Sequence, residues 1–327
     1  MSYPVSACCF IRNNSVGFCL YESMASLLPL CREMVIMDLG SDDGTLETLA
    51  DIANHNPKVK LVSGSFYNID ANVFATLAND LIAMCKYDNV LYWQADEIWH
   101  EDLLKLMEQR FERGEFDLSF WRIQYANNFQ YVKWFPQLVH RVGYKGKDIK
   151  FNEEKENFEF NNDGMNTTRQ WDAKICSDYG GEYNIQWGEM GQEGIKPYVN
   201  QMITDVSLIG GFRDNIPDRK RMHAPFWKET EVLIPYFDRV TKKQPLMSES
   251  EWMQTALADE DWTKEDSPYN LPAILRYHVG KTKYELSPEL WEALRWERTK
   301  EFISSLLIRM KSLSDSYRYL IASEESG

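Results

Sequence analysis

The sequence is poor in positive charge and has no long apolar run. Lysine and arginine number 36 against 50 aspartates and glutamates, a formal charge of −14. Nucleic-acid binding needs a basic surface, so this balance argues against a nucleic-acid partner. No apolar stretch reaches the roughly 20 residues that span a bilayer, and residues 1–9 lack the basic and apolar regions of a signal peptide. We therefore expect neither a transmembrane segment nor a leader.

The cysteines show no CxxC spacing, and most of the six lie in apolar segments. This is typical of reduced core residues in a cytoplasmic protein. They are Cys8, Cys9, Cys19, Cys31, Cys85 and Cys176. Neither GxxxxGK[ST] nor GxGxxG occurs, so there is no P-loop and no dinucleotide fingerprint. The apolar share of 44% nevertheless predicts a globular chain with a sizeable core.

Apolar, β-prone runs alternate with helical patterns over the first hundred residues. Strands are predicted at residues 5–11, 34–39, 59–62 and 90–93, with a helix between each pair. This alternation predicts an α/β fold with crossover connections and a mainly parallel sheet.

Polar side chains follow three of these strands. Because the carboxyl ends of parallel strands meet at one edge, the pattern predicts a functional cleft there. The residues concerned are Arg12, Asp38, Asp43 and Asp96. Taken singly, Arg12 is also explained as a surface ion pair, and Asp38 and Asp43 as turn formers.

The fourth predicted strand ends in an acidic turn, Gln94-Ala95-Asp96-Glu97. Carboxylates at such a strand end commonly hold a divalent cation through oxygen, and the cation can hold a diphosphate. The alternative is a solvated acidic turn that caps the next helix, predicted at residues 102–111.

Four motifs together resemble the GT-A glycosyltransferases of family 2. Residues 38–45 (DLGSDDGT) are similar to that family's D-D-G-S-T-D-G-T loop, and residues 11–14 (IRNN) to its (I/V)-(R/K)-N-E. Residues 77–79 (LAN) stand where the family has A-R-N, and residues 94–97 (QADE) resemble its D-A-D-E metal motif, with Gln94 in place of the first Asp. The order and spacing agree over residues 4–112.

The resemblance implies a GT-A fold and transfer of a sugar from a nucleoside-diphosphate sugar, with Mn²⁺ or Mg²⁺ as cofactor. It implies that Asp96 binds the metal and that Gln94 hydrogen-bonds the ribose or a metal-bound water. Asp38 would accept from the nucleobase or ribose, and Arg12 would face the base or the diphosphate. Phe10, Asp43 and Asn79 complete the expected nucleotide-binding set.

The later part of the chain holds weaker candidates. Glu189 is the first candidate for a general base, followed by Asp163 and Asp172; a surface carboxylate is the alternative for Glu189. The basic segment at residues 219–225 contains His223, which the resemblance implies as a second metal ligand. The alternative for this segment is a cationic surface loop.

Strands are also predicted at residues 117–125, 129–135 and 137–142. The chain is divided into a GT-A domain at residues 1–230 and a helical region at 231–327. Within the GT-A domain, residues 1–112 form the nucleotide-sugar half and residues 113–230 the acceptor half. Ser287 and Pro288 are expected to open a C-terminal helix. Its apolar stripe packs on the chain's own core or, alternatively, forms a homodimer.

The predicted function is a metal-dependent glycosyltransferase that uses a nucleotide sugar and a glycan or protein acceptor. Gln94 and Met190, which replaces a family Asp, keep a non-catalytic nucleotide-sugar or glycan-binding protein open. A sugar nucleotidyltransferase is the other alternative, although its G-x-G-T-R-x-x-P-x-T-K loop is absent.

Overall fold

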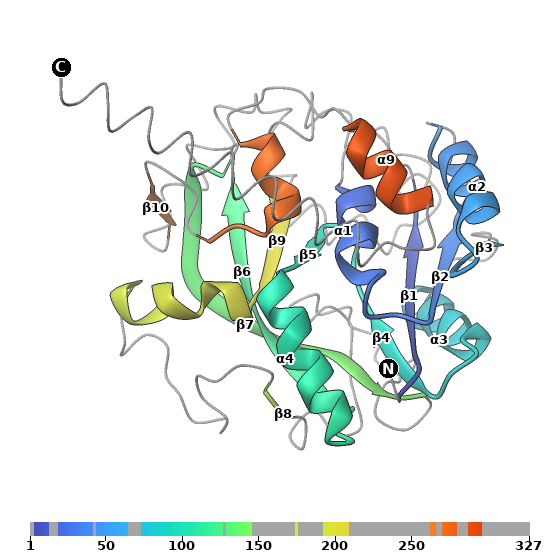
Figure 1. Ribbon diagram of the computed structural model, residues 1–327, viewed down its shortest axis with the longest axis horizontal. Coiled ribbons are helices and arrows are strands. Elements are labelled where there is room, and N and C mark those ends of the chain that lie inside the picture. The colour runs from blue at the N-terminus through green and yellow to red at the C-terminus, as the bar shows by residue number, and fades with distance from the viewer. Residues whose placement is uncertain are drawn as a thin grey trace.

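The fold is that of a computed structural model, in which the described residues form one mixed sheet with helices on both faces (Figure 1). The sheet order is β3-β2-β1-β4-β7-β6-β9-β5, with β10 beside β7 and β8 beside β6. The described residues are 3–12, 19–41, 44–64, 73–126, 129–145, 174–175, 192–208, 262–265, 270–279 and 287–295.

The first half is a parallel sheet, as predicted. Its strands are β1 (Val5–Ile11), β2 (Glu33–Asp38), β3 (Val59–Ser63) and β4 (Asn89–Tyr92). β1 lies between β2 and β4 and pairs in parallel with both. The predicted α/β class with a mainly parallel sheet is therefore confirmed.

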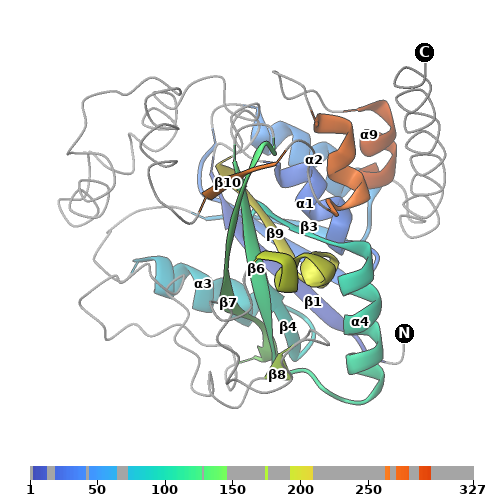
Figure 2. The same cartoon turned by 90° about the vertical axis from the view of Figure 1, so that its left-hand side faces the viewer.

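Helices cover both faces of this half. α1 (Leu20–Leu27) and α2 (Thr45–His55) lie on one face, and α3 (Val73–Met84) lies on the other (Figure 2). Two separate apolar clusters result. One joins α1 and α2 to the sheet, and the other joins Leu77, Ala78 and Leu81 of α3 to β1, β2 and β4. The strands are consequently buried on both sides, which explains their nearly continuous apolar sequence.

The second half continues the sheet with antiparallel pairs. β6 (Leu118–Ala126) pairs with β7 (Tyr131–Tyr144), and β7 also pairs with β4. The separate strands predicted at 129–135 and 137–142 were wrong, because they form the single strand β7. The register between β6 and β7 shifts between Arg122 and Gln124, opposite the boundary between the two predicted strands.

Four short strands were not predicted. They are β5 (Glu97–Trp99), β8 (Lys174–Ile175), β9 (Ile203–Leu208) and β10 (Trp262–Lys264). β5 pairs antiparallel with β9, which pairs in parallel with β6. β5, β8 and β10 have only two or three residues each, too few to show an alternating pattern, so only their partners define them. The six-residue β9 was overlooked.

The position of β5 tests the alternative interpretation, in which the acidic turn caps the next helix. β5 separates that turn from α4 (Glu101–Glu112), whose N-cap is His100, with Nδ1 accepting from the Asp102 amide at 3.1 Å. The alternative in which Asp96 and Glu97 cap this helix was therefore wrong.

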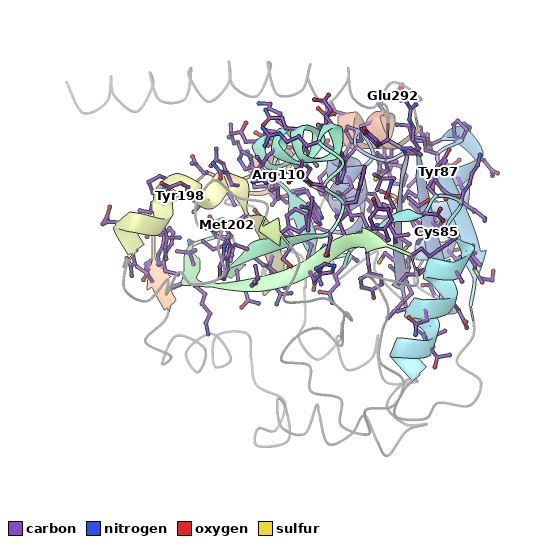
Figure 3. The ribbon with its side chains drawn as sticks, turned by 90° about the horizontal axis from the view of Figure 1, so that it is seen from below. Cys85, Tyr87, Arg110, Tyr198, Met202 and Glu292 are labelled. Atoms are coloured by element: carbon purple, nitrogen blue, oxygen red, sulfur yellow. The ribbon has the colours of Figure 1, made fainter. Side chains whose placement is uncertain are left out.

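The C-terminal part returns to the first half. α9 (Pro288–Arg295) begins as predicted, with Ser287 Oγ accepting from the Leu290 amide at 3.1 Å. Leu290 and Leu294 are buried in the cluster that covers α1 and α2, so these two members of the stripe pack on the chain's own core. Figure 3 shows Glu292 of α9 and Arg110 of α4 on the side of the sheet opposite α3.

η2 (Lys196–Gln201) and η5 (Ala273–His278) are 3₁₀ helices of six residues each. Within the described ranges no helix is long and apolar enough to cross a membrane. Cys8, Cys9, Cys19, Cys31 and Cys85 are buried and form no disulfides with one another, as expected, and Cys176 lies outside the described residues. The division into domains at residues 112 and 230 stays a prediction.

Candidate functional site

The predicted polar residues lie at one edge of the sheet, where β1, β2 and β4 end. Asp38 of β2 is the register partner of Ile11, the last residue of β1. On the other side of β1, the Trp93 amide bonds the Cys8 carbonyl, which continues the pairing toward Gln94. Arg12 therefore follows the partner of Asp38, and the turn after β4 lies on the far side of β1 at the same edge of the sheet.

Asp38 holds its own loop in place. Its Oδ1 accepts from the amides of Gly40 and Ser41, both at 2.9 Å, and its Oδ2 accepts from the Ser41 hydroxyl. Gly40 has a φ of +83° and Gly44, which precedes α2, has a φ of +89°. Glycine adopts such angles without a steric penalty, so both residues suit the backbone at their positions.

The acidic turn is tied down along its backbone. The Gln94 carbonyl accepts from the Glu97 amide at 3.0 Å, and the Asp96 carbonyl accepts from the Val206 amide of β9 at 3.0 Å. Ser23 Oγ of α1 donates to the Glu97 carbonyl. The Cys19 thiol donates to the Ala95 carbonyl, with 3.8 Å between sulfur and oxygen. Every carbonyl from residue 94 to 97 thus has a donor.

The side chains of this turn alternate in exposure. Ala95 and Glu97 are buried, whereas those of Gln94 and Asp96 are only half-buried. The half-buried pair corresponds to the two positions of the family's metal motif. The turn therefore presents an amide and a carboxylate from a backbone with little freedom to move.

Glu97 is the residue that the sequence interpretation missed. Its carboxylate accepts from Arg141 Nε at 3.0 Å and from the terminal amino group of the same guanidinium at 2.8 Å. Arg122 of β6 lies 3.5 Å from Glu97 and 3.5 Å from Asp205 of β9. The available signal was an arginine, Arg141, next to Val142 in a β-prone segment.

The charges of the turn shift the pKa of a residue on β1. Burial raises the pKa of the Cys9 thiol, and the negative charges of Asp96 and Glu97 raise it further. The local field at this edge is therefore negative toward Cys9, although Arg141 opposes it.

Phe10 and Asn79 occupy the face covered by α3. The Phe10 ring lies 6.3 Å from that of Tyr92 and packs against the apolar cluster under α3. Asn79 is half-buried in the middle of α3. The remaining predicted residues, Asp43, Asp163, Asp172, Glu189 and His223, lie outside the described residues.

The expected metal site is only partly represented. Among the described residues no group of three or more His, Cys, Asp or Glu side chains could hold a metal ion. The oxygens of Asp96 and Gln94 nevertheless suit Mg²⁺ or Mn²⁺, which commonly bind one or two carboxylates and complete their shell with substrate phosphates and water. The residues present fit a cation that arrives with a diphosphate.

The described elements form an α/β fold of the GT-A type. Residues 19–175, just under half of the chain, match the model of glycosyl transferase family 2. The match confirms the resemblance for the three motifs that lie within these residues, at 38–45, 77–79 and 94–97. No curated protein matches the chain.

Solved structures are similar over a smaller part. S. aureus TarS, residues 1–349, is 16% identical over 38% of this chain and 35% of its own, with a TM-score of 0.28. Glucosyl-3-phosphoglycerate synthase from Mycobacterium tuberculosis, in complex with Mn²⁺, uridine diphosphate and phosphoglyceric acid, is 17% identical over 38% of this chain and 43% of its own, with a TM-score of 0.26. This chain therefore spans less than half of either protein.

Proposed function

We propose that this protein transfers a sugar from a nucleoside-diphosphate sugar to a hydroxyl of a glycan or protein acceptor, with Mn²⁺ or Mg²⁺ bound at the acidic turn. One observation carries the proposal. Arg12, Asp38 and the turn at residues 94–97 follow three neighbouring strands of a parallel sheet, at the edge where α/β proteins bind ligands. The family match over residues 19–175 supports the same reaction class.

Each residue at this edge has a distinct part in the proposal. Asp96 is a ligand of the cation, and the Gln94 amide hydrogen-bonds the ribose or a metal-bound water. Arg12 faces the base or the diphosphate. When bound, the cation neutralises charge that develops on the departing diphosphate.

Asp38 has two tasks in this proposal. Its carboxylate organises the loop through the bonds to Gly40 and Ser41, and it accepts from the nucleobase or ribose with its remaining lone pairs. Phe10, Asp43 and Asn79 belong to the same nucleotide-binding set.

The remaining parts are proposed from the sequence alone. His223 is the second protein ligand of the cation, and Glu189, with Asp163 and Asp172 behind it, is the base that takes the acceptor proton. Homodimerisation through the C-terminal helices is a further proposal.

The test uses the full chain and a panel of nucleoside diphosphates and their sugars with Mn²⁺. Thermal shift reports binding, and release of the nucleoside diphosphate without acceptor reports turnover. Asp96→Ala is expected to abolish Mn²⁺-dependent turnover and to keep the fold. Asp88→Ala is the matched control, because Asp88 is an exposed carboxylate just before β4, at the opposite end of the same strand. Wild-type turnover in Asp96→Ala would remove the metal assignment.

Gln94 favours a second candidate, a non-catalytic nucleotide-sugar-binding protein. Replacing a carboxylate by an amide removes one negative charge from the turn, which lowers its attraction for a divalent cation. A binding protein would give a thermal shift with a nucleotide sugar but release no nucleoside diphosphate. The same panel therefore separates the two functions.

A further inference from the structure

The acidic turn is located where the chain passes from one half of the sheet to the other. It follows β4, which pairs with β1, and it precedes β5, which pairs with β9 (Figure 1). Glu97, Arg122, Arg141 and Asp205 come from β5, β6, β7 and β9. We call these four residues the buried charge network. Glu97 is the last residue of the turn, and the other three members lie in the second half of the sheet.

The network is deeply buried. The side chains of Glu97, Arg141 and Asp205 are 0%, 1% and 6% exposed, and that of Arg122 is 13% exposed. Desolvation makes such pairs expensive, and well-packed apolar residues of similar size commonly stabilise a fold as well or better. Stability alone therefore does not account for two carboxylates and two guanidinium groups in this core. A requirement that the neighbouring turn keep one defined geometry does account for them.

Glu97 transmits that geometry to the turn. The same carboxylate that is gripped by Arg141 accepts from the Gln94 amide at 3.3 Å, and the Glu97 amide donates back to the Gln94 carbonyl. A shift of the Glu97 side chain therefore moves the first residue of the turn. Asp96 lies between these two anchored residues.

We propose that Glu97, clamped by Arg141, is a positioning residue that sets the orientation of Gln94 and Asp96 and thereby the affinity of this edge for a divalent cation and a nucleoside diphosphate. The inference rests on the proposed function. Ser23 assists from α1, because its hydroxyl donates to the Glu97 carbonyl. The clamp also ties the cation site to β7.

The experiment measures the dissociation constant of Mn²⁺ in the presence of uridine diphosphate, from the electron paramagnetic resonance signal of free Mn²⁺. Glu97→Gln keeps the size of the side chain but removes its charge. Because substitution of partners behind a metal ligand typically weakens metal binding by about 10–100-fold, we expect a loss of that order. Arg141→Lys keeps the charge but loses the two-pronged contact, so we expect a smaller loss.

Two further variants separate positioning from folding. Ser23→Ala removes only a hydroxyl, so it is expected to fold and to weaken Mn²⁺ binding less than Glu97→Gln does. Asn56→Ala is the structural control. Asn56 lies at the end of α2, away from the turn, where it is fully buried and donates to the Leu294 carbonyl of α9. This substitution is expected to lower thermal stability and leave the Mn²⁺ dissociation constant unchanged. All measurements are made at a temperature where circular dichroism shows each variant folded.

The outcomes are distinct. Equal Mn²⁺ affinity in wild type, Glu97→Gln and Ser23→Ala, together with a loss in Asp96→Ala, would overturn the positioning role and leave the proposed function standing. A loss of Mn²⁺ affinity in Asn56→Ala as large as that in Glu97→Gln would overturn the positioning role, because Glu97 would then act only through the stability of the fold. Failure of the wild type to bind Mn²⁺ with any nucleotide of the panel would overturn the proposed function and this inference with it.

Discussion

The carboxylate of Glu97 receives two hydrogen bonds from one guanidinium, that of Arg141, at 3.0 and 2.8 Å. The two residues lie 44 positions apart in the sequence, on β5 and β7, and both are almost completely buried. Paired guanidinium and carboxylate groups of this geometry are strong and directional. The last residue of the acidic turn is therefore held in one position by a strand in the middle of the sheet.

The first prediction concerns the stability of this pair. Arg141→Met removes the partner of a buried carboxylate, and we expect the free energy of unfolding to fall by about 3–5 kcal/mol. Combining it with Glu97→Gln should cost less than the sum of the two single changes, because both remove the same contact. Urea denaturation of the single and double variants measures this coupling. Additive losses would show that the two side chains act independently.

The second prediction uses two glycines in the left-handed region. Gly40 and Gly114 have φ angles of +83° and +75°, and a Cβ at either would meet no atom within 4 Å. Alanine at either site should therefore lower the free energy of unfolding by a similar amount, about 1–2 kcal/mol, from backbone strain alone. Only Gly40→Ala should also weaken nucleotide binding, since the Gly40 amide bonds Asp38. Equal nucleotide affinity of both variants in calorimetry would contradict a role for the Asp38 loop.

The third prediction concerns acid. Burial and the positive charge of Arg141 lower the pKa of His140 from 6.5 to about 4, although Asp117 lies 3.4 Å from Nε2. Below pH 6.5 the unfolded chain binds a proton on this imidazole, whereas the folded chain does so only near pH 4. The free energy of unfolding therefore falls as the pH drops through this window, by about 2 kcal/mol at pH 5.

His140→Asn should remove that share of the pH dependence. An asparagine amide can still reach Ser119 Oγ, which lies 3.2 Å from His140 Nδ1. Burial also lowers the pKa of His100, and this group acts alike in both proteins. Denaturation at pH 7.5 and pH 5 gives the two slopes. Parallel slopes for wild type and variant would count against a neutral, buried His140.

The fourth prediction concerns the docking of α9 on α2. Asn56 donates to the Leu294 carbonyl at 3.0 Å and accepts from the Lys58 amide at 3.1 Å. Asn56→Ala leaves these buried groups unsatisfied, so we expect a loss of about 1–3 kcal/mol. Asp51→Ala, which breaks the exposed contact with Arg295 between the same two helices, should cost about 1 kcal/mol or less. Equal losses in thermal or urea unfolding would contradict the difference in burial.

Much of the first half could be predicted because its signals are local. β1 was predicted residue for residue, and β2, β3 and β4 were predicted to within one residue at each end. The Ser287-Pro288 pair predicted the start of α9 correctly. Turn glycines, caps and apolar runs are written in adjacent residues, so a single sequence is sufficient to locate them.

The site was predicted only in part. Arg12, Asp38 and the turn at residues 94–97 were placed on one edge, because parallel strands order their ends whatever their partners are. β5, β9 and the clamp on Glu97 were missed. β5, with three residues, has no pattern of its own, and Glu97 was interpreted only as one member of an acidic motif.

By itself, the sequence determined the alternation of strands and helices, and with it the edge at which the polar residues gather. Only the tertiary structure decided that Glu97 is paired inside the core with Arg141, whereas Asp96 stays half-buried beside it. The physical reason is that two adjacent carboxylates of one motif have the same local signal. Their surroundings differ only after distant strands pair, and burial beside a guanidinium is a property of that pairing.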